Sequence, residues 1–329
     1  EFITDGVWAE SRSRYGYRNL RGFPLLIDLG GIPFIDVRAS FNSFVPASLD
    51  KKIADKLIEY YIDQLENDPR NHDKVEFEVI FSCYTFDIDK RLKCLIKHGF
   101  TKSEIAKIKK SLLDLTNDII NNDHGIWKED EKLINFLQLR QQTILNSNLN
   151  EIEKMYWLTE DCKRYGTLPF AGLARAGFIA VTMLKSLVRE GHLEETDYHE
   201  FLNSLEVVNS QMATDLQLLS KKEFLTKYGH LRPGTYDILS ERYDEAPEKY
   251  FSFTKKRDPS EVKSFHTDFG LNLKKMNKIK ELVEQHGINQ DVVDLFNFFK
   301  GAIEGREYSK FIFTKSLSEV MKLFEQLGT

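Results

Sequence analysis

The sequence predicts a predominantly α-helical α+β protein, with a small antiparallel three-stranded sheet near the N-terminus followed by a helical bundle. Two observations support this class. Strand-like segments rich in β-branched and aromatic residues all fall before about residue 86. Beyond that point apolar residues recur mainly at helical spacing. We therefore expect a small α+β subdomain over residues 1–85 and a helical region over residues 86–329.

Composition is that of an ordinary globular protein. The 329 residues are 41% hydrophobic, which is enough to bury a sizeable core. A formal charge of -5 argues against a nucleic-acid-binding protein. The three cysteines are widely spaced and favour neither a disulfide framework nor a zinc site, so we expect a reduced, cytoplasmic setting. No apolar run approaches the ~18 residues that span a bilayer, so we expect no membrane segment.

The N-terminal part is predicted to contain a helix and then a hairpin. Residues 4–17 have an amphipathic pattern around Trp8. Two apolar runs flank Gly30 and Gly31, which favours a β-hairpin with a primed turn. In the second run four polar residues recur at period two and are expected to share one sheet face, either a solvated face or a ligand platform. They are Asp36, Arg38, Ser40 and Asn42.

A third strand is predicted over residues 75–86, reading VEFEVIFSCYTF, because it is β-branched and aromatic with partial alternation. The remaining elements are predicted helices. Their expected ranges are 48–66, 87–97, 101–121, 128–146, 150–164, 169–190, 197–219, 222–228, 262–285 and 290 to the C-terminus, the last with breaks near residues 305 and 316.

Histidine and cysteine placement indicates no metal site in this chain. His98, His124 and His286 each precede a glycine, which is typical of a helix C-terminus. No HExxH or CxxC motif is present, and no His pair stands at helical spacing with a carboxylate outside these positions. We therefore assign the three histidines to helix ends and expect no metal bound by this chain alone.

The helix that opens with LPFAGLARAGFIAV is expected to pack closely against a neighbour. Its small residues keep the helix slim, so another helix or a ligand can approach its backbone. Arg175 is the only charge between Thr167 and Leu184, and an unpaired buried charge is prohibitive. We expect it either to pair with a carboxylate such as Asp237 or to bind an anionic group of a ligand.

The stretch YGHLRPGTYDILSERY, residues 228–243, is the leading candidate for a site. Gly229, Pro233 and Gly234 prevent regular structure there, so its polar side chains sit on a constrained loop. The alternative is a helix-ending turn whose arginine and aspartate satisfy one another. The candidate residues on the loop are His230, Arg232, Tyr236, Asp237 and Arg242.

Nucleotide-binding motifs are absent from the sequence. There is no GxxxxGK[ST], no strand-linked GxGxxG, no kinase catalytic loop and no GxSxG elbow. The chain therefore has the character of a recognition module that lacks its own source of chemical energy.

Five blocks, in this order, resemble the central region of L-glutamine kinase and its relatives of bacterial capsule phosphoramidate synthesis. They are ITDGVWAESRSRYGYRNLRGFPLL, IDVRASFNSFVPASL, LPFAGLARAGFIA, GHLRPGTYD and GREYSKFIFTKSL. The loop also resembles a segment of phosphoenolpyruvate-synthase-like and rifampin-phosphotransferase-like enzymes. One departure is Ser240-Glu241-Arg242, where relatives often have Ser-Pro-Arg.

The resemblance implies an enzyme of three parts: an ATP-grasp domain that binds ATP and Mg, a central acceptor-binding region, and a swivelling domain with a phosphorylated histidine. This chain would be the central region alone, without a cofactor of its own and not active alone, so the ATP-grasp and phosphohistidine domains would act in cis. The acceptor would be the side-chain amide of L-glutamine. His230 would contact the reacting groups and would not be the phosphocarrier.

The residue types suit this role, because phosphoryl transfer depends on positioning and on cations that face the transferring group. Arg232 and His230 would serve catalysis. Arg38, Asn42, Arg175, Tyr236, Asp237 and Arg242 would bind the substrate, Asp237 taking the ammonium. Two alternatives stay open: the same scaffold acting on another small acceptor, and a non-catalytic helical docking module.

Overall fold

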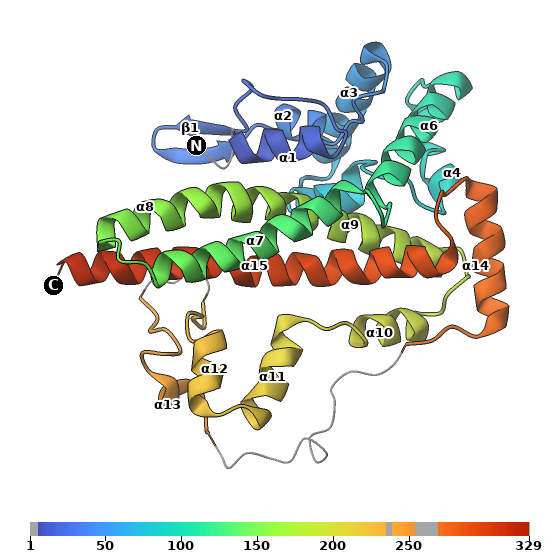
Figure 1. Ribbon diagram of the computed structural model, residues 1–329. Helices are drawn as coiled ribbons and strands as arrows, with labels where there is room; N and C mark the ends of the chain where they lie inside the picture. Colours follow the sequence, from blue (N-terminus) through green and yellow to red (C-terminus); the bar gives the residue numbers. More distant parts are fainter. Residues whose placement is uncertain (1–5, 235–238, 254–268, 329) are drawn as a thin grey trace. The chain divides into compact units, whose positions relative to one another are not determined.

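The computed structural model describes residues 6–234, 239–253 and 269–328. The predicted class is confirmed, because the described chain is mostly helical with a small antiparallel sheet near the N-terminus (Figure 1). The chain divides into two compact units, each built from three sequence segments. The first unit takes residues 1–130, 171–198 and 271–303, and the second takes residues 131–170, 199–270 and 304–329. Residues 1–85, the expected subdomain, all belong to the first unit.

The first unit contains the sheet and the helices around it. Its complete elements are α1 (Trp8–Arg14), β1 (Leu26–Leu29), β2 (Ile32–Ile35), α2 (Val37–Asn42), α3 (Lys51–Asn67), η2 (Pro69–Asn71), η3 (Val75–Val79), α4 (Ile88–Arg91), α5 (Cys94–Lys97), α6 (Lys102–Ile119) and α14 (Leu273–His286). The N-cap Thr101 and Glu104 form the predicted capping box of α6.

The regular elements among the described residues of the second unit are all helices, joined by loops. Its complete elements are α8 (Glu151–Cys162), η4 (Lys163–Thr167), α11 (Val208–Leu218), α12 (Lys221–Tyr228) and α13 (Pro247–Tyr250). Four further helices contribute residues to both units: α7 (Ile126–Leu145), α9 (Leu168–Arg189), α10 (Glu195–Asn203) and α15 (Val292–Gly328). The breaks predicted near residues 305 and 316 are wrong, since α15 is continuous.

The hairpin forms where it was predicted, but its second strand is shorter. Gly30 and Gly31 have φ of 66° and 86°, the left-handed conformations that a two-residue primed turn requires. β2 ends at Ile35, and the Asp36 side chain then accepts the Ala39 N–H at 2.9 Å to start α2. The expected sheet face of alternating polar residues is therefore wrong, because Val37–Asn42 is helical.

The predicted third strand is also wrong. Val75–Val79 forms the π-helix η3, and the chain then runs without a strand partner to Asp87, so the described sheet has two strands. Side chains replace the missing partner strand: the Phe81 N–H donates to Tyr61 Oη, the Tyr84 N–H to Thr116 Oγ1, and the Phe86 N–H to Ser186 Oγ. Strand propensity here reflects burial of large side chains and not pairing with another strand.

Close packing of α9, predicted from its small residues, is seen at Gly172. A Cβ there would collide with the side chains of Asp130 and Tyr15. Asp130 is buried, accepts a hydrogen bond from Tyr15 Oη at 2.9 Å and lies 2.9 Å from Arg14 Nη1. Burial raises the pKa of Asp130 to about 6.

One helical stretch corrects the expectation that no segment is apolar enough to span a membrane. Within Glu151–Arg189, an 18-residue window has the necessary length and composition, and 56% of that window is buried inside the structure. A buried core helix of a globular protein passes the same test, so this window is weak support for a membrane span.

Candidate functional site

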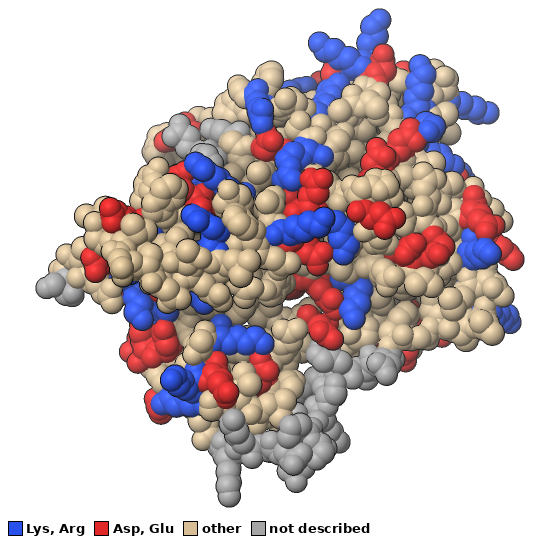
Figure 2. Space-filling view, in the orientation of Figure 1, with Lys and Arg blue, Asp and Glu red and all other residues tan. Residues whose placement is uncertain are grey.

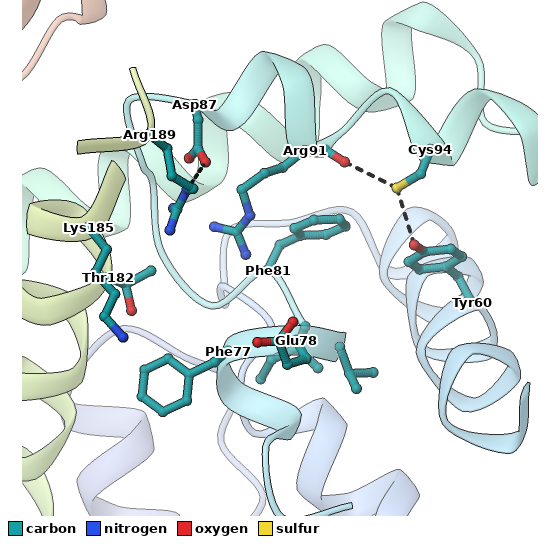
Figure 3. Close-up of a pocket in the computed structure, with 12 residues that line it drawn as sticks. Tyr60, Phe77, Glu78, Phe81, Asp87, Arg91, Cys94, Thr182, Lys185 and Arg189 are labelled. Atoms are coloured by element: carbon teal, nitrogen blue, oxygen red, sulfur yellow. Dashed lines mark hydrogen bonds and ion pairs between the residues drawn. The ribbon is translucent and has the colours of Figure 1, made fainter. Parts of the chain in front are cut away.

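A cavity of about 530 Å³ lies within the first unit, between η3, the start of α4 and one face of α9 (Figure 3). We call it the Arg91 pocket and define it by Glu78, Asp87, Arg91, Thr182, Lys185 and Arg189. Tyr60, Phe77, Phe81 and Cys94 add aromatic and sulfur surface to its wall. Its volume is in the range of small-molecule sites, roughly 300–1,000 Å³.

Local structure explains why these side chains share one cavity. Thr182, Lys185 and Arg189 are spaced three and four residues apart, so they lie on one face of α9. Asp87 and Arg91 are likewise separated by four residues at the start of α4. Figure 3 shows the Arg91, Lys185 and Arg189 side chains directed toward the same space, with Glu78 on η3 facing them.

Arg91 and Lys185 keep donors available for a ligand. The Arg91 guanidinium donates one hydrogen bond, from Nη1 to Thr85 Oγ1 at 3.2 Å, and its Cζ lies 5.4 Å from the centroid of the Phe81 ring. Lys185 Nζ lies 6.0 Å from the centroid of the Phe77 ring. Among the described residues, neither cation has an ion-pair partner. Both side chains therefore bring positive charge to the pocket without forming an ion pair among the described residues.

Asp87 supplies a buried carboxylate to the same wall. Its Oδ2 accepts a hydrogen bond from Arg189 Nε at 2.6 Å. Burial raises the pKa of Asp87, but hydrogen bonds from Arg189 and Thr85 and the positive charges of Arg189 and Arg91 together lower it below its usual value, so the group is ionised at neutral pH. Within the described part of the chain, Asp87 Oδ1 is buried and has no hydrogen-bond partner. The Asp87 carboxylate lines the pocket as a charged group.

Glu78 adds a second, exposed acceptor, and no ion pair of Glu78 exists among the described residues. On the opposite side, Cys94 Sγ donates its hydrogen to the Arg91 carbonyl oxygen at 3.1 Å. The Tyr60 hydroxyl, whose oxygen lies 3.2 Å from the sulfur, therefore donates its hydrogen to Cys94 Sγ. The Arg91 pocket thus combines cations, carboxylates and aromatic surface. This set is complementary to a small zwitterion with an apolar chain.

Arg175 lies in the interior of the first unit and, of the two alternatives for it, pairs with a carboxylate; the partner is Glu76, and Asp237 lies outside the described residues. Its Nη1 donates to Glu76 Oε2 at 2.9 Å and its Nη2 to Ser82 Oγ at 2.7 Å. Its Nε donates to Tyr17 Oη at 3.0 Å, and its side chain is 1% exposed. Since Glu76 is on η3 and Ser82 on the segment that follows, Arg175 holds the wall of the Arg91 pocket in place.

Arg38 and Asn42 lie together on α2 and line a second cavity of about 510 Å³ in the first unit. Arg38 is exposed and its Nη1 donates to Glu59 Oε1 at 2.6 Å. Asn42 Oδ1 accepts from Arg18 Nη1 at 2.7 Å, and its Nδ2 donates to the Arg38 carbonyl at 2.9 Å. Both polar residues of this second cavity thus have hydrogen-bond partners within the protein.

The loop candidates lie in the second unit, and Tyr236 and Asp237 lie outside the described residues. Arg242 is buried and donates from Nε and Nη2 to the two oxygens of Asp244, with a further bond from Nη2 to Glu319 at 2.9 Å. Arg232 Nη1 donates to the Ser240 carbonyl at 2.6 Å. In the structure, both arginines make bonds within the protein.

His230 is 4% exposed, and burial lowers its pKa to about 3, so its imidazole is neutral at pH 7. Its Nε2 lies 3.4 Å from the Phe311 carbonyl, which can only accept, so the proton is on Nε2. Among the described residues, Nδ1 has no partner and carries a free lone pair. In this arrangement His230 can accept a hydrogen bond but has no N–H left to offer to a phosphoryl oxygen.

Sequence reasoning missed the six residues that define the Arg91 pocket. The spacing of Lys185 and Arg189 on the polar end of α9 was visible in the sequence, as was the four-residue spacing of Asp87 and Arg91. What joins the two pairs is the long-range contact of α9 with the residue 75–87 segment, for example between the Phe178 and Phe77 rings at 5.3 Å. No local pattern encodes that contact.

No protein-family model, curated protein or solved structure matches the chain. Within the described ranges, no group of three or more His, Cys, Asp or Glu side chains is placed to hold a metal ion. On the face shown in Figure 2, cationic and anionic side chains are interspersed. The chemistry of the pocket and the sequence resemblance are therefore the two indications of function.

Proposed function

We propose that this chain is the acceptor-binding region of an ATP-dependent phosphotransferase, and that the Arg91 pocket receives an amino-acid acceptor, L-glutamine. The observation that carries the proposal is the presence of two cations without an ion-pair partner among the described residues, Arg91 and Lys185, and of the carboxylates of Asp87 and Glu78 around one cavity. The sequence blocks that resemble L-glutamine kinase supply the reaction class, and the pocket supports the choice of acceptor.

Each end of the acceptor has a suitable partner in the pocket. The α-carboxylate would bind Arg91 and Lys185, because guanidinium and ammonium groups form charge-assisted hydrogen bonds with carboxylates. The ammonium would bind the carboxylate of Asp87, which lines the pocket and is ionised at neutral pH. Phe77 and Phe81 would cover the methylene chain, and Glu78 would accept from the amide N–H group.

The phosphoryl donor would come from other domains of the enzyme. ATP and Mg would bind in an ATP-grasp domain, and a phosphohistidine on a swivelling domain would carry the phosphoryl group, so this chain has no donor chemistry of its own. His230, Arg232 and Arg242, together with Tyr236, Asp237, Arg38 and Asn42, remain proposed contacts of the reacting groups. Arg175 has a different proposed role, which is to position the pocket wall through Glu76 and Ser82.

The first experiment is isothermal titration calorimetry of the chain with L-glutamine. We expect saturable binding, at least about tenfold weaker in Arg91→Met, since loss of one charge-assisted contact costs about 1.5–3 kcal/mol. Asp87→Asn should weaken binding similarly, while Lys110→Met, an exposed cation outside the pocket, should have no effect. No heat from the wild type at millimolar ligand, or equal affinity in Arg91→Met, contradicts the proposal.

Titration with related amino acids tests which acceptor the pocket binds. L-Glutamate, L-asparagine and γ-glutamyl analogues present the same zwitterion with a different side-chain end. If one of them binds more tightly than L-glutamine through the same residues, the acceptor is that other small molecule and not L-glutamine. The docking alternative expects arginines that are exposed and paired: Arg38 is exposed and paired with Glu59, whereas Arg175 and Arg242 are buried.

The reaction class has its own test, which is the coding sequence on either side of this chain. An ATP-grasp region before Glu1 and a histidine-bearing region after Thr329 would support the phosphotransferase. A continuous coding sequence that lacks both would contradict it, whatever the pocket binds.

A further inference from the structure

The β1–β2 hairpin exposes both of its faces and both of its edges. Every residue from Ile27 to Ile35 is exposed. Large apolar side chains between residues 23 and 37 are 37–63% exposed, namely Phe23, Ile27, Leu29, Ile32, Phe34, Ile35 and Val37. An isolated two-stranded sheet is marginally stable in water, and an exposed apolar patch of this kind marks an interaction surface.

The hydrogen-bond register shows which backbone groups point outward. Asp36 N–H donates to the Leu25 carbonyl at 2.8 Å, and the register pairs Leu26 with Ile35 and Leu29 with Ile32. Bonded and non-bonded pairs alternate along an antiparallel ladder. The non-bonded pairs are therefore Leu26 with Ile35 and Asp28 with Pro33, and their backbone groups face away from the hairpin.

The two edges differ because of one residue. On β2 the outward positions are Pro33 and Ile35, and proline has no N–H to donate. On β1 the outward positions, Leu26 and Asp28, offer a complete set of N–H and C=O groups, and no hydrogen bond to them exists within the described residues. The β1 edge can accept a further strand, and the β2 edge is blunted.

The apolar face of the hairpin adds to this asymmetry. Because side chains alternate between faces, four apolar residues share one face without a polar residue between them. They are Ile27, Leu29, Ile32 and Phe34. The opposite face carries Asp28, whose side chain is bonded to the Gly31 N–H at 2.7 Å and so does not cover the edge.

We propose that β1 pairs with β1 of a second copy of this chain, forming a continuous four-stranded antiparallel sheet about a two-fold axis. Antiparallel pairing of a strand with its own copy is a two-fold operation, so the edge is self-complementary. In the proposed register Leu26 lies opposite Asp28 of the second copy, and the two-fold axis repeats this pair. Each of the two pairs exchanges two backbone hydrogen bonds, which gives about four in all. This register also places Ile27 next to Ile27 of the second copy. This inference is independent of the ligand in the Arg91 pocket.

Sedimentation velocity between about 1 and 100 μM tests the interface. We expect concentration-dependent dimers in the wild type. Leu26→Pro removes an outward N–H from the β1 edge and should weaken dimerisation at least tenfold, whereas Ile35→Pro removes the matching N–H from the β2 edge and should leave it unchanged. A monomer across the whole range overturns the proposal, and so does equal weakening by the two variants.

Disulfide trapping gives a second readout that does not depend on proline. Ile27→Cys should form a covalent dimer on mild oxidation, because the two copies meet at a non-bonded pair with Cα atoms about 4.5 Å apart. Leu29→Cys is the matched control, since that residue lies opposite Leu25 of the second copy and not its own counterpart. Crosslinking of Leu29→Cys as efficiently as Ile27→Cys, or of neither, overturns the proposed register.

Discussion

Two segments of the first unit have strand-like sequences, and they differ in how their backbone groups are hydrogen-bonded and in whether their side chains are buried. The hairpin of β1 and β2 satisfies its inner backbone groups by pairing but leaves its apolar side chains in solvent. The segment from Ile80 to Asp87 buries its side chains but pairs with no strand among the described residues, and three side-chain hydroxyls accept three of its N–H groups. Strand propensity thus reports two separable properties, apolar burial and backbone pairing.

The difference predicts where substitutions will cost stability. In the buried segment each hydroxyl acceptor is matched to one N–H, and an orphaned buried donor costs about 1–3 kcal/mol. In the hairpin, single side chains make few internal contacts, so their replacement should cost little in the isolated chain. Four measurements test this contrast, the largest effect first.

The largest effect is expected at Arg175. Replacement by methionine removes the donors to Ser82 and Tyr17 and leaves Glu76 without its nearest cation. We therefore expect the free energy of unfolding, measured in urea, to fall by about 3–5 kcal/mol. Arg38→Met, beside the hairpin, removes an exposed pair with Glu59 and should not change the midpoint. A loss below about 1 kcal/mol for Arg175→Met would show that the buried segment does not depend on the hydrogen bonds of Arg175.

Tyr61→Phe should have the next largest effect. The substitution keeps the ring but removes the acceptor of the Phe81 N–H, which is buried, so we expect a loss of about 1–3 kcal/mol by chemical unfolding. Tyr60→Phe is the matched control, because the Tyr60 hydroxyl bonds to Cys94 Sγ and to no backbone group. Equal losses for the two variants would contradict a specific role for the backbone contact.

Acid should weaken the buried segment through His286, whose Nδ1 lies 2.9 Å from Tyr84 Oη. Burial, with Lys109 nearby, lowers the pKa of His286 below 6.5, so below that pH the unfolded chain binds more protons than the folded one. Stability from this group is present above pH 6.5 and decreases as the pH falls. His286→Gln should reduce the acid slope of the unfolding free energy.

That slope should decrease without disappearing in His286→Gln. Burial lowers the pKa of His230 to about 3, so His230 contributes to acid destabilisation over the window from pH 6.5 down to 3. An unchanged slope in His286→Gln would contradict the shift in its pKa.

The smallest effect is expected at Leu29. Leu29→Thr replaces a side chain that is 58% exposed with another residue suited to strands, so the unfolding free energy should stay within about 0.5 kcal/mol. The measurement belongs at low micromolar concentration, where association is weakest. A loss above 1 kcal/mol would show that the hairpin has internal support in the monomer and would remove the contrast between the two segments.

Local signals in the sequence were sufficient for elements whose determinants are local. Gly30-Gly31 fixed the hairpin turn, and Thr101 with Glu104 fixed the start of α6, because each involves residues next to one another. The end of β2 also had a local signal, Asp36 as an N-cap, but the polar residues that follow also fit strand alternation. The six residues of α2 therefore fitted both the alternation of a strand and the period of a helix.

The site depended on contacts that no local pattern contains. The sequence required a partner for Arg175, and the structure supplies Glu76, 99 residues away. The Arg91 pocket needs α9 to pack against residues 75–87, so its two pairs of charged residues meet only in the folded chain. For the loop, the sequence found a polar cluster, but it gave no indication that Arg242 would be buried against Asp244 and Glu319.

The hydroxyl acceptors around the buried segment have a consequence for hydrogen exchange. The amides of Phe81, Tyr84 and Phe86 belong to no helix or strand, yet each is buried and bonded to a side chain. Their exchange with deuterium should require the opening of the surrounding helices, so they should be protected as strongly as core helical amides. An amide-exchange map of this protein would therefore mark residues 81–86 as part of its most slowly opening region, although no regular secondary structure is present there.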